Sequence, residues 1–202
     1  MKKILVWDLP TRVGHWLLVA SFAVAWFTGE SEEWRLVHVA AGYAMAAVLA
    51  FRVFWGFAGS RYARFSSFLF SPAQAWAYLA GIVRRNMAHW VGHNPAGSYM
   101  IYLLILLGFA VVGTGWAAYN DVGSNWLQEM HGWLANAMLI AVCVHLTGVV
   151  VGGALHRENL VRSMVDGRKK GYDMDAIASS RASWTLLLLG LVGCAAAAAF
   201  FG

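Results

Sequence analysis

The sequence predicts an all-α membrane protein, built as a bundle of transmembrane helices. Hydrophobic residues make up 60% of the 202-residue chain and charged residues only 12%, whereas about a quarter of a typical soluble domain is charged. The apolar residues form continuous runs of about 20, which is long enough for a helix to cross roughly 30 Å of hydrocarbon. Because these runs do not alternate with polar residues, they favour helices over the strands of a membrane barrel.

Five apolar segments are expected to cross the membrane. They are Arg12–Thr28, Trp34–Ala58, Ser98–Tyr119, Trp126–Leu155 and Ser183–Phe201. The fourth is longer than one crossing requires, so we expect it to tilt or to extend beyond the bilayer. The first is not expected to be a removable signal peptide, because Pro10, Arg12 and His15 interrupt its apolar core.

The connection between the second and third segments contains a further helix signal. Ser71 is a typical N-cap and Pro72 a typical first helical residue, and apolar residues then recur at helical spacing to about residue 85. This pattern predicts an amphipathic helix near residues 72–85, either on the inner leaflet or packed under the bundle. The segment 157–181 is polar and charged, and we expect it to be a solvated connector.

The distribution of charge predicts the orientation. Most of the 15 Lys and Arg residues fall before the first segment or in the second-to-third and fourth-to-fifth connections, and the opposite loops carry Glu30, Glu32, Glu33 and Asp121. The positive-inside rule then places the N-terminus in the cytoplasm and the C-terminus in the periplasm of a bacterial inner membrane. The net charge of +5 is explained by topology and lipid headgroups rather than by nucleic acid.

Four histidines lie within these apolar segments: His15, His38, His131 and His145. His131 and His145 are 14 residues apart, which is about four helical turns and roughly 21 Å of rise, so both lie on nearly the same face of one helix. The alternating direction of the segments places His15 and His145 near the cytoplasmic side and His38 and His131 near the periplasmic side. An ionisable side chain is costly within a membrane, so four at two matched depths indicate a function.

Paired imidazoles at two depths suit haem iron. A zinc site requires about four ligands, and no Cys or carboxylate accompanies either pair. Two imidazoles from different helices can instead fill the two axial positions of a haem within a helical bundle. The chain has no Cys-x-x-Cys-His motif, so each haem would be bound without covalent attachment. The alternative is a non-haem transporter that uses the histidines as proton relays.

Cations near the ligands are candidates to bind haem propionates. Arg12 lies one turn before His15, and Arg52 lies within the second segment toward its cytoplasmic end. Snorkelling to the headgroups is the alternative for Arg52. The remaining histidines, His89, His93 and His156, lie in or next to cytoplasmic loops, and we expect them to be surface residues.

Several stretches together resemble a known family, the bacterial diheme b-type cytochromes, which include prokaryotic cytochrome b561 and the cytochrome b subunit of nickel–iron hydrogenases. The similarity covers nearly all of residues 1–170. The stretches that carry it are the Trp-Asp-Leu-Pro-Thr-Arg-Val-Gly-His-Trp opening at 7–16, His38 with Gly42-Tyr43, residues 52–56, residues 59–65, Gly92-His93-Asn94-Pro95, and the segment from His131 through His145 to Leu160.

The resemblance implies non-covalent haem b, with His15, His38, His131 and His145 as axial ligands. It also implies electron exchange between membrane quinone and a redox partner, either a periplasmic c-type cytochrome or a hydrogenase-like protein. The family core has four helices. We therefore expect a four-helix diheme core over residues 1–182 and an additional transmembrane helix over residues 183–202.

The predicted function is electron transfer across the bilayer by two haems b, in an electron-transfer protein or a subunit of a quinone-linked oxidoreductase. A stand-alone, quinone-coupled superoxide oxidase is an alternative, since some family members resemble one. Besides quinone and the redox protein, the lipid bilayer is an expected partner. Whether the chain also associates with further copies of itself is left open.

Overall fold

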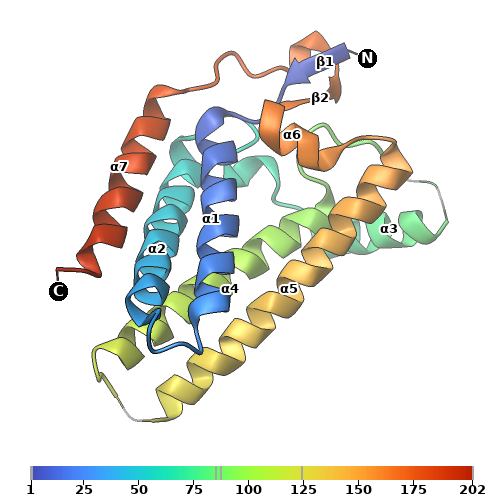
Figure 1. Ribbon diagram of the computed structural model, residues 1–202. Helices are drawn as coiled ribbons and strands as arrows, with labels where there is room; N and C mark the ends of the chain where they lie inside the picture. The colour runs from blue at the N-terminus through green and yellow to red at the C-terminus, as the bar shows by residue number, and fades with distance from the viewer. Residues whose placement is uncertain (1, 85, 87, 124, 202) are drawn as a thin grey trace.

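The computed structural model describes residues 2–84, 86, 88–123 and 125–201, and most of them are helical (Figure 1). The sequence predictions that reach residues 1, 85 and 202 end outside the described residues. The helices are α1 (Leu9–Thr28), α2 (Arg35–Ala58), α3 (Pro72–Val83), α4 (Pro95–Tyr119), α5 (Trp126–His156), α6 (Leu160–Asp166) and α7 (Ser183–Ala198). Two strands, β1 (Lys2–Leu5) and β2 (Arg168–Gly171), and two 3₁₀ turns, Phe65–Ser67 and Asp173–Asp175, complete the chain.

Side-chain caps start two of the long helices three residues before their apolar segments begin. The Asp8 carboxylate accepts a bond from the Thr11 amide at 2.9 Å, so α1 begins at Leu9. Asn94 accepts from the Gly97 amide at 2.7 Å, so α4 begins at Pro95. The cap stabilises the first turn by accepting hydrogen bonds from its free backbone N–H groups. This turn therefore needs no apolar side chains, and a helix boundary drawn from hydropathy leaves it out.

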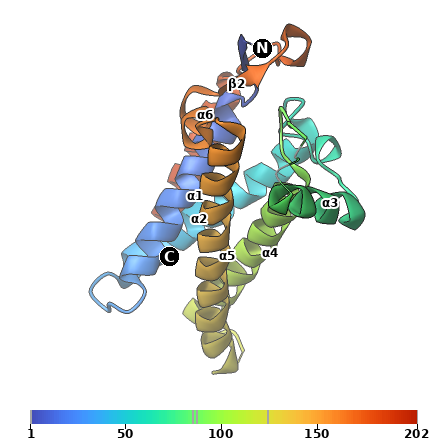
Figure 2. The same ribbon diagram turned by 90° about the vertical axis from the view of Figure 1, so that its right-hand side faces the viewer.

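The short helix predicted near residues 72–85 is confirmed as α3. Ser71 and Gln74 form a reciprocal capping box at its start, and Arg84 is its C-cap. Figure 2 shows α3 projecting sideways at the beginning of α4, the helix against which it packs. Its large apolar side chains Trp76, Leu79 and Val83 are exposed, as expected for a helix that lies at a membrane surface.

Helix α2 is central to the bundle, with α1, α4 and α7 packed around it, while α5 packs along α4 (Figure 1). On one side Val48, Phe51 and Trp55 of α2 contact Leu188 and Val192 of α7. On the other side Met45 and Leu49 of α2 contact Val111 of α4 and Met138 of α5. The residues of α7 thus join the same hydrophobic core as the helices that carry the histidines.

The protein is a multi-pass membrane protein. Helices α2, α4 and α5 are long and apolar enough to cross a membrane, and large side chains such as Trp133 (77% exposed) and Val150 (71% exposed) lie on the outside of the bundle. The other two predicted spans correspond to α1 and α7, which are less apolar or shorter than these three helices. The first half of α1 contains Arg12 and His15, and α7 is a shorter apolar helix of 16 residues, about 24 Å long.

The expectation that residues 157–181 form a solvated connector is wrong. This segment contains α6 and then β2, which pairs antiparallel with β1, so that Lys2 lies opposite Gly171 and Leu5 opposite Arg168. Beneath the two strands, Ile4, Val6 and Ile177 join a buried cluster. The two strands are only four residues long and contain several lysines, so their sequences show no alternation of apolar and polar residues. Their apolar face forms only when the two strands, which are far apart in sequence, pair with each other.

Candidate functional site

The structure brings His38 of α2 and His131 of α5 together. Their imidazole ring centroids are 6.0 Å apart, and the ring planes are nearly perpendicular, at 86°. The pairing predicted from depth alone is therefore present in the folded chain. The two residues come from helices that do not follow each other in sequence, and α4 packs against both helices.

Hydrogen bonds fix the tautomer of both rings. The Nδ1 of His38 lies 2.8 Å from the carbonyl oxygen of Ala25, and the Nδ1 of His131 lies 3.0 Å from that of Val111. A carbonyl can only accept, so each Nδ1 must carry the proton and donate it. Each Nε2 therefore has a free lone pair, which is the arrangement found for histidines that ligate a metal through Nε2.

Small residues surround these two histidines. A Cβ on Gly115 would lie only 2.8 Å from Cε1 of His131, so the ring occupies the space that a larger residue would fill. A Cβ on Gly29 would lie 3.6 Å from the ring of His38. The space next to Gly42, one turn after His38, is open to at least 4 Å. The glycine that matters most for the pair is therefore Gly115, which comes from a helix without a predicted ligand.

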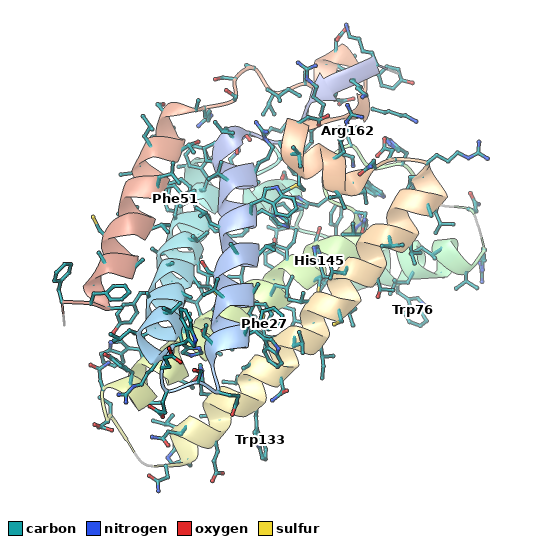
Figure 3. The ribbon with its side chains drawn as sticks, viewed as in Figure 1. Phe27, Phe51, Trp76, Trp133, His145 and Arg162 are labelled. Atoms are coloured by element: carbon teal, nitrogen blue, oxygen red, sulfur yellow. The ribbon has the colours of Figure 1, made fainter. Side chains whose placement is uncertain are left out.

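The second predicted pair, His15 and His145, lies toward the end of the bundle that holds β1 and β2. Figure 3 shows His145 on the part of α5 that faces α1, the helix that carries His15. The Nδ1 of His15 is buried without a hydrogen-bond partner among the described residues. Trp16 packs edge-on against His15 at 5.3 Å and donates to the carbonyl of Met164 at 3.0 Å, which ties α1 to α6.

The two arginines predicted near the cytoplasmic pair occupy different surroundings. Arg12 donates to the carbonyl of Val165, while its Nε is buried without a partner in the described part of the chain. The guanidinium of Arg52 lies 4.9 Å from the ring centroid of Phe65, and its Nη1 is likewise buried and unpaired among the described residues. Arg52 does not snorkel to the surface, because its guanidinium lies against the aromatic side chains of the 65–68 turn.

The expectation that His93 is a surface residue is wrong. Its ring lies between Phe68 (centroids 4.4 Å apart) and Trp7 (4.7 Å), and its Nδ1 is buried. Burial lowers the pKa of His93 to about 3, and the nearby Arg52 and Lys169 cations act in the same direction. His89, by contrast, is exposed and lies 3.2 Å from a carboxylate oxygen of Glu158, while His156 lies 3.4 Å from the hydroxyl of Tyr78.

Asp8 is a structural residue that the sequence interpretation did not assign. Its side chain is fully buried and accepts bonds from the Thr11 amide, the Trp55 indole at 3.0 Å and the Ser60 amide at 3.3 Å. The carboxylate thus caps α1 and binds the end of α2 at the same time. The only sequence signal is its position before Pro10 at the start of an apolar run, which indicates a cap and nothing more.

The His38–His131 pair fits haem iron better than a small metal ion. A metal–imidazole bond is about 2 Å long, so two ligands on opposite sides of one iron place their ring centroids about 6 Å apart. The spacing of His38 and His131 meets this requirement. Within the described residues there is no group of three or more His, Cys, Asp or Glu side chains that could hold a metal ion. A cofactor that supplies its own equatorial ligands needs only two imidazoles from the protein.

The fold and the facing His38 and His131 rings define the class of a helical membrane protein with paired imidazoles in its interior. The chain belongs to the prokaryotic cytochrome b561 family, whose model matches residues 6–167. It is therefore a b-type cytochrome that binds haem b and transfers electrons in a membrane. No solved structure matches the chain.

Three relatives illustrate the similarity. Proteins described as probable Ni/Fe-hydrogenase B-type cytochrome subunits from Rhizobium leguminosarum bv. viciae and Cupriavidus necator are 23% and 25% identical to the chain, each over 83% of its length. The matches cover 89% and 87% of those relatives. A probable Ni/Fe-hydrogenase 1 B-type cytochrome subunit from Escherichia coli K12 is 27% identical over 57% of the chain and 60% of its own length.

Proposed function

We propose that the protein is a diheme cytochrome b that carries electrons across the bilayer between the quinone pool and a periplasmic redox partner. One haem b is ligated by His38 and His131 and the other by His15 and His145. The observation that carries this proposal is the His38–His131 pair, with ring centroids 6.0 Å apart and both Nδ1 atoms bonded to backbone carbonyls.

The protein residues determine what such haems can do. A hydrogen bond from Nδ1 to a carbonyl holds the ring in place and raises the basicity of Nε2 as a ligand. With two histidines of the protein as its ligands, each bound haem would supply one-electron exchange. Leu49, Val111 and Met138 form an apolar cluster where α2, α4 and α5 meet, and such packing keeps the helices that carry the ligands rigid.

Arg12 and Arg52 are proposed partners of propionates on the cytoplasmic-side haem. Each has a buried nitrogen without a partner among the described residues, and a buried unpaired donor is costly unless a ligand satisfies it. Arg12 lies in the first turn of α1 and Arg52 in the last two turns of α2. These helix ends lie toward β1 and β2, which carry the basic residues Lys2, Lys3 and Arg168 (Figure 1).

The charges at the two ends of the bundle support an orientation and a kind of partner. The basic end is proposed to face the cytoplasm, and the α1–α2 loop with Glu30, Glu32 and Glu33 lies at the opposite end (Figure 1). That acidic loop, together with Asp121, could steer a basic redox protein to the periplasmic surface. The relatives are described as hydrogenase subunits, which supports a hydrogenase-like partner, and a c-type cytochrome is the alternative.

The decisive experiment counts haems. A pyridine haemochrome assay on the purified protein should give two haems b per chain, and His131→Ala or His145→Ala should each leave one. His89→Ala is the matched control, because His89 is exposed and belongs to neither pair, and it should retain two haems. A wild-type protein with one haem, or a His131→Ala variant with two, would contradict the proposal. Quinol-driven reduction of both haems would then test the direction of electron flow.

A further inference from the structure

Three polar side chains from separate parts of the chain surround Phe68. The His93 ring lies 4.4 Å from the Phe68 ring and the Tyr102 ring lies 5.5 Å from it, measured between centroids. The guanidinium of Arg52 lies 5.9 Å from the same ring. Helix α2, the loop before α4 and α4 itself therefore each contribute one polar group to a place walled by Phe65 and Phe68.

Each of these three side chains has a buried polar atom without a partner in the described part of the chain: Arg52 Nη1, His93 Nδ1 and the Tyr102 hydroxyl. Leaving one buried donor unsatisfied costs about 1–3 kcal/mol. The nearby carboxylate of Asp8 already accepts from Thr11, Trp55 and Ser60, and no ion pair to Arg52 occurs among the described residues. Three unsatisfied groups in one place indicate a ligand rather than three separate packing faults.

The cluster lies at the depth of the cytoplasmic pair. Arg52 follows His38 by 14 residues on α2, just as His145 follows His131 by 14 residues on α5. On each helix this spacing is about four turns and roughly 21 Å, which returns nearly to the same face. Arg52 is therefore on the His38 face of α2, and it is level with the second pair rather than the first.

The chemistry of the three groups selects the ligand. Arginine presents a planar set of donors that matches a carboxylate, and a tyrosine hydroxyl and an imidazole N–H add single donors. Inside a protein, such a cation is stabilised by a group of opposite charge. The ligand must therefore offer anionic acceptor oxygens and must reach an apolar, aromatic place from the bundle interior.

We propose that Arg52, His93 and Tyr102 together bind a propionate carboxylate of the cytoplasmic-side haem. Arg52 supplies the charge, and His93 and Tyr102 position the carboxylate. The inference rests on the proposed function, because it needs a haem between His15 and His145. It adds two residues, His93 and Tyr102, to which neither spacing nor charge pointed.

The loop that carries His93 is held in place from both sides. Lys169 of β2 donates to the carbonyl of Trp90 at 3.1 Å, and Asn94 caps α4 directly after His93. The ring itself is wedged between Trp7 and Phe68. A neutral imidazole fixed in this way can present an N–H donor without reorganising when the ligand binds.

The first test is a redox titration of both haems. Arg52→Gln removes a cation beside one haem, so its reduction equilibrium should shift toward the ferric form by at least tenfold, about 59 mV for a one-electron couple. Arg52→Lys should restore most of the shift, and the haem of His38 and His131 should keep its potential. Arg35→Gln is the matched control, because Arg35 precedes His38 and lies over Tyr119 at 5.4 Å. It should leave the cytoplasmic-side haem unchanged.

The second test detects the carboxylate directly. With haem labelled by ¹³C at the propionate carboxyl carbons, the label-sensitive bands of the redox-difference infrared spectrum should shift in Tyr102→Phe and in His93→Gln, and not in Arg35→Gln. Tyr102→Phe removes one oxygen atom and keeps the ring, so it remains informative if Arg52→Gln does not fold. Unchanged bands in both variants would overturn the inference and leave water as the occupant. A chain without two haems would instead contradict the proposed function.

Discussion

The two histidine pairs differ in how completely the protein has built them. At His38 and His131 both Nδ1 atoms are bonded to backbone carbonyls, and the rings are already 6.0 Å apart. At the other end the Nδ1 of His15 is buried without a partner among the described residues, and the same holds for Arg12 Nε and Arg52 Nη1. The first site is organised by helix backbones, and the second contains polar groups that a bound cofactor would satisfy.

This difference has a physical cause. Where α4 packs along α5, Val111 and Gly115 of α4 contact His131, and backbone carbonyls are available as acceptors. The end of the bundle that holds β1 and β2 is instead assembled from α1, α2, α6 and the 65–68 and 90–94 segments. Polar side chains that come from so many segments cannot all find hydrogen-bond partners within the protein. A bound ligand then supplies the missing partners.

The largest effect is expected at the pre-built pair. Gly115→Leu should remove the haem of His38 and His131, because even a Cβ at this position would lie 2.8 Å from the His131 ring. The haem content should fall from two to one per chain, and the remaining haem should keep the spectrum of the His15–His145 site. Gly113→Leu is the control, since nothing lies within 4 Å of a Cβ there. Two haems in Gly115→Leu would show that the ring can move.

A smaller effect is expected from Asp8→Asn, at the end of the bundle that holds β1 and β2. The Asp8 carboxylate accepts three hydrogen bonds from α1, α2 and Ser60, so the change should lower the free energy of unfolding by about 1–3 kcal/mol. It should also shift the potential of the His15–His145 haem more than that of the other haem. Asp173→Asn is the control, because Asp173 is exposed and its carboxylate pairs with the exposed Lys2. Equal effects of the two variants would contradict the structural role of Asp8.

The smallest effect is the change per pH unit on acidification, at most about 1.4 kcal/mol. The pKa of His93 is lowered from 6.5 to about 3, so between these pH values the unfolded chain binds a proton that the folded chain does not. The stability of the protein should therefore decrease as the pH falls through this range. His93→Gln should reduce that slope, whereas His89→Gln should not, since His89 is exposed. Thermal unfolding in detergent between pH 7 and pH 4 measures the difference, and equal slopes for wild type and His93→Gln would contradict it.

The candidate site was predictable to the extent that it depends on helical periodicity. The spacing of His131 and His145 and the alternating direction of the helices are enough to pair His38 with His131. The same reasoning failed for His93, because its environment is formed by Trp7 and Phe68, which are distant from it in sequence. It also missed Asp8, whose second role depends on Trp55, 47 residues away.

The sequence by itself determined that the chain is a helical membrane protein with imidazoles at two depths, since hydrophobicity and the 3.6-residue period act locally along each helix. Only the tertiary structure decided that β1 pairs with β2, that Gly115 makes room for His131, and that Arg52, His93 and Tyr102 meet around Phe68. These features depend on contacts between residues far apart in the chain, and no local pattern encodes which distant side chain will fill a given space.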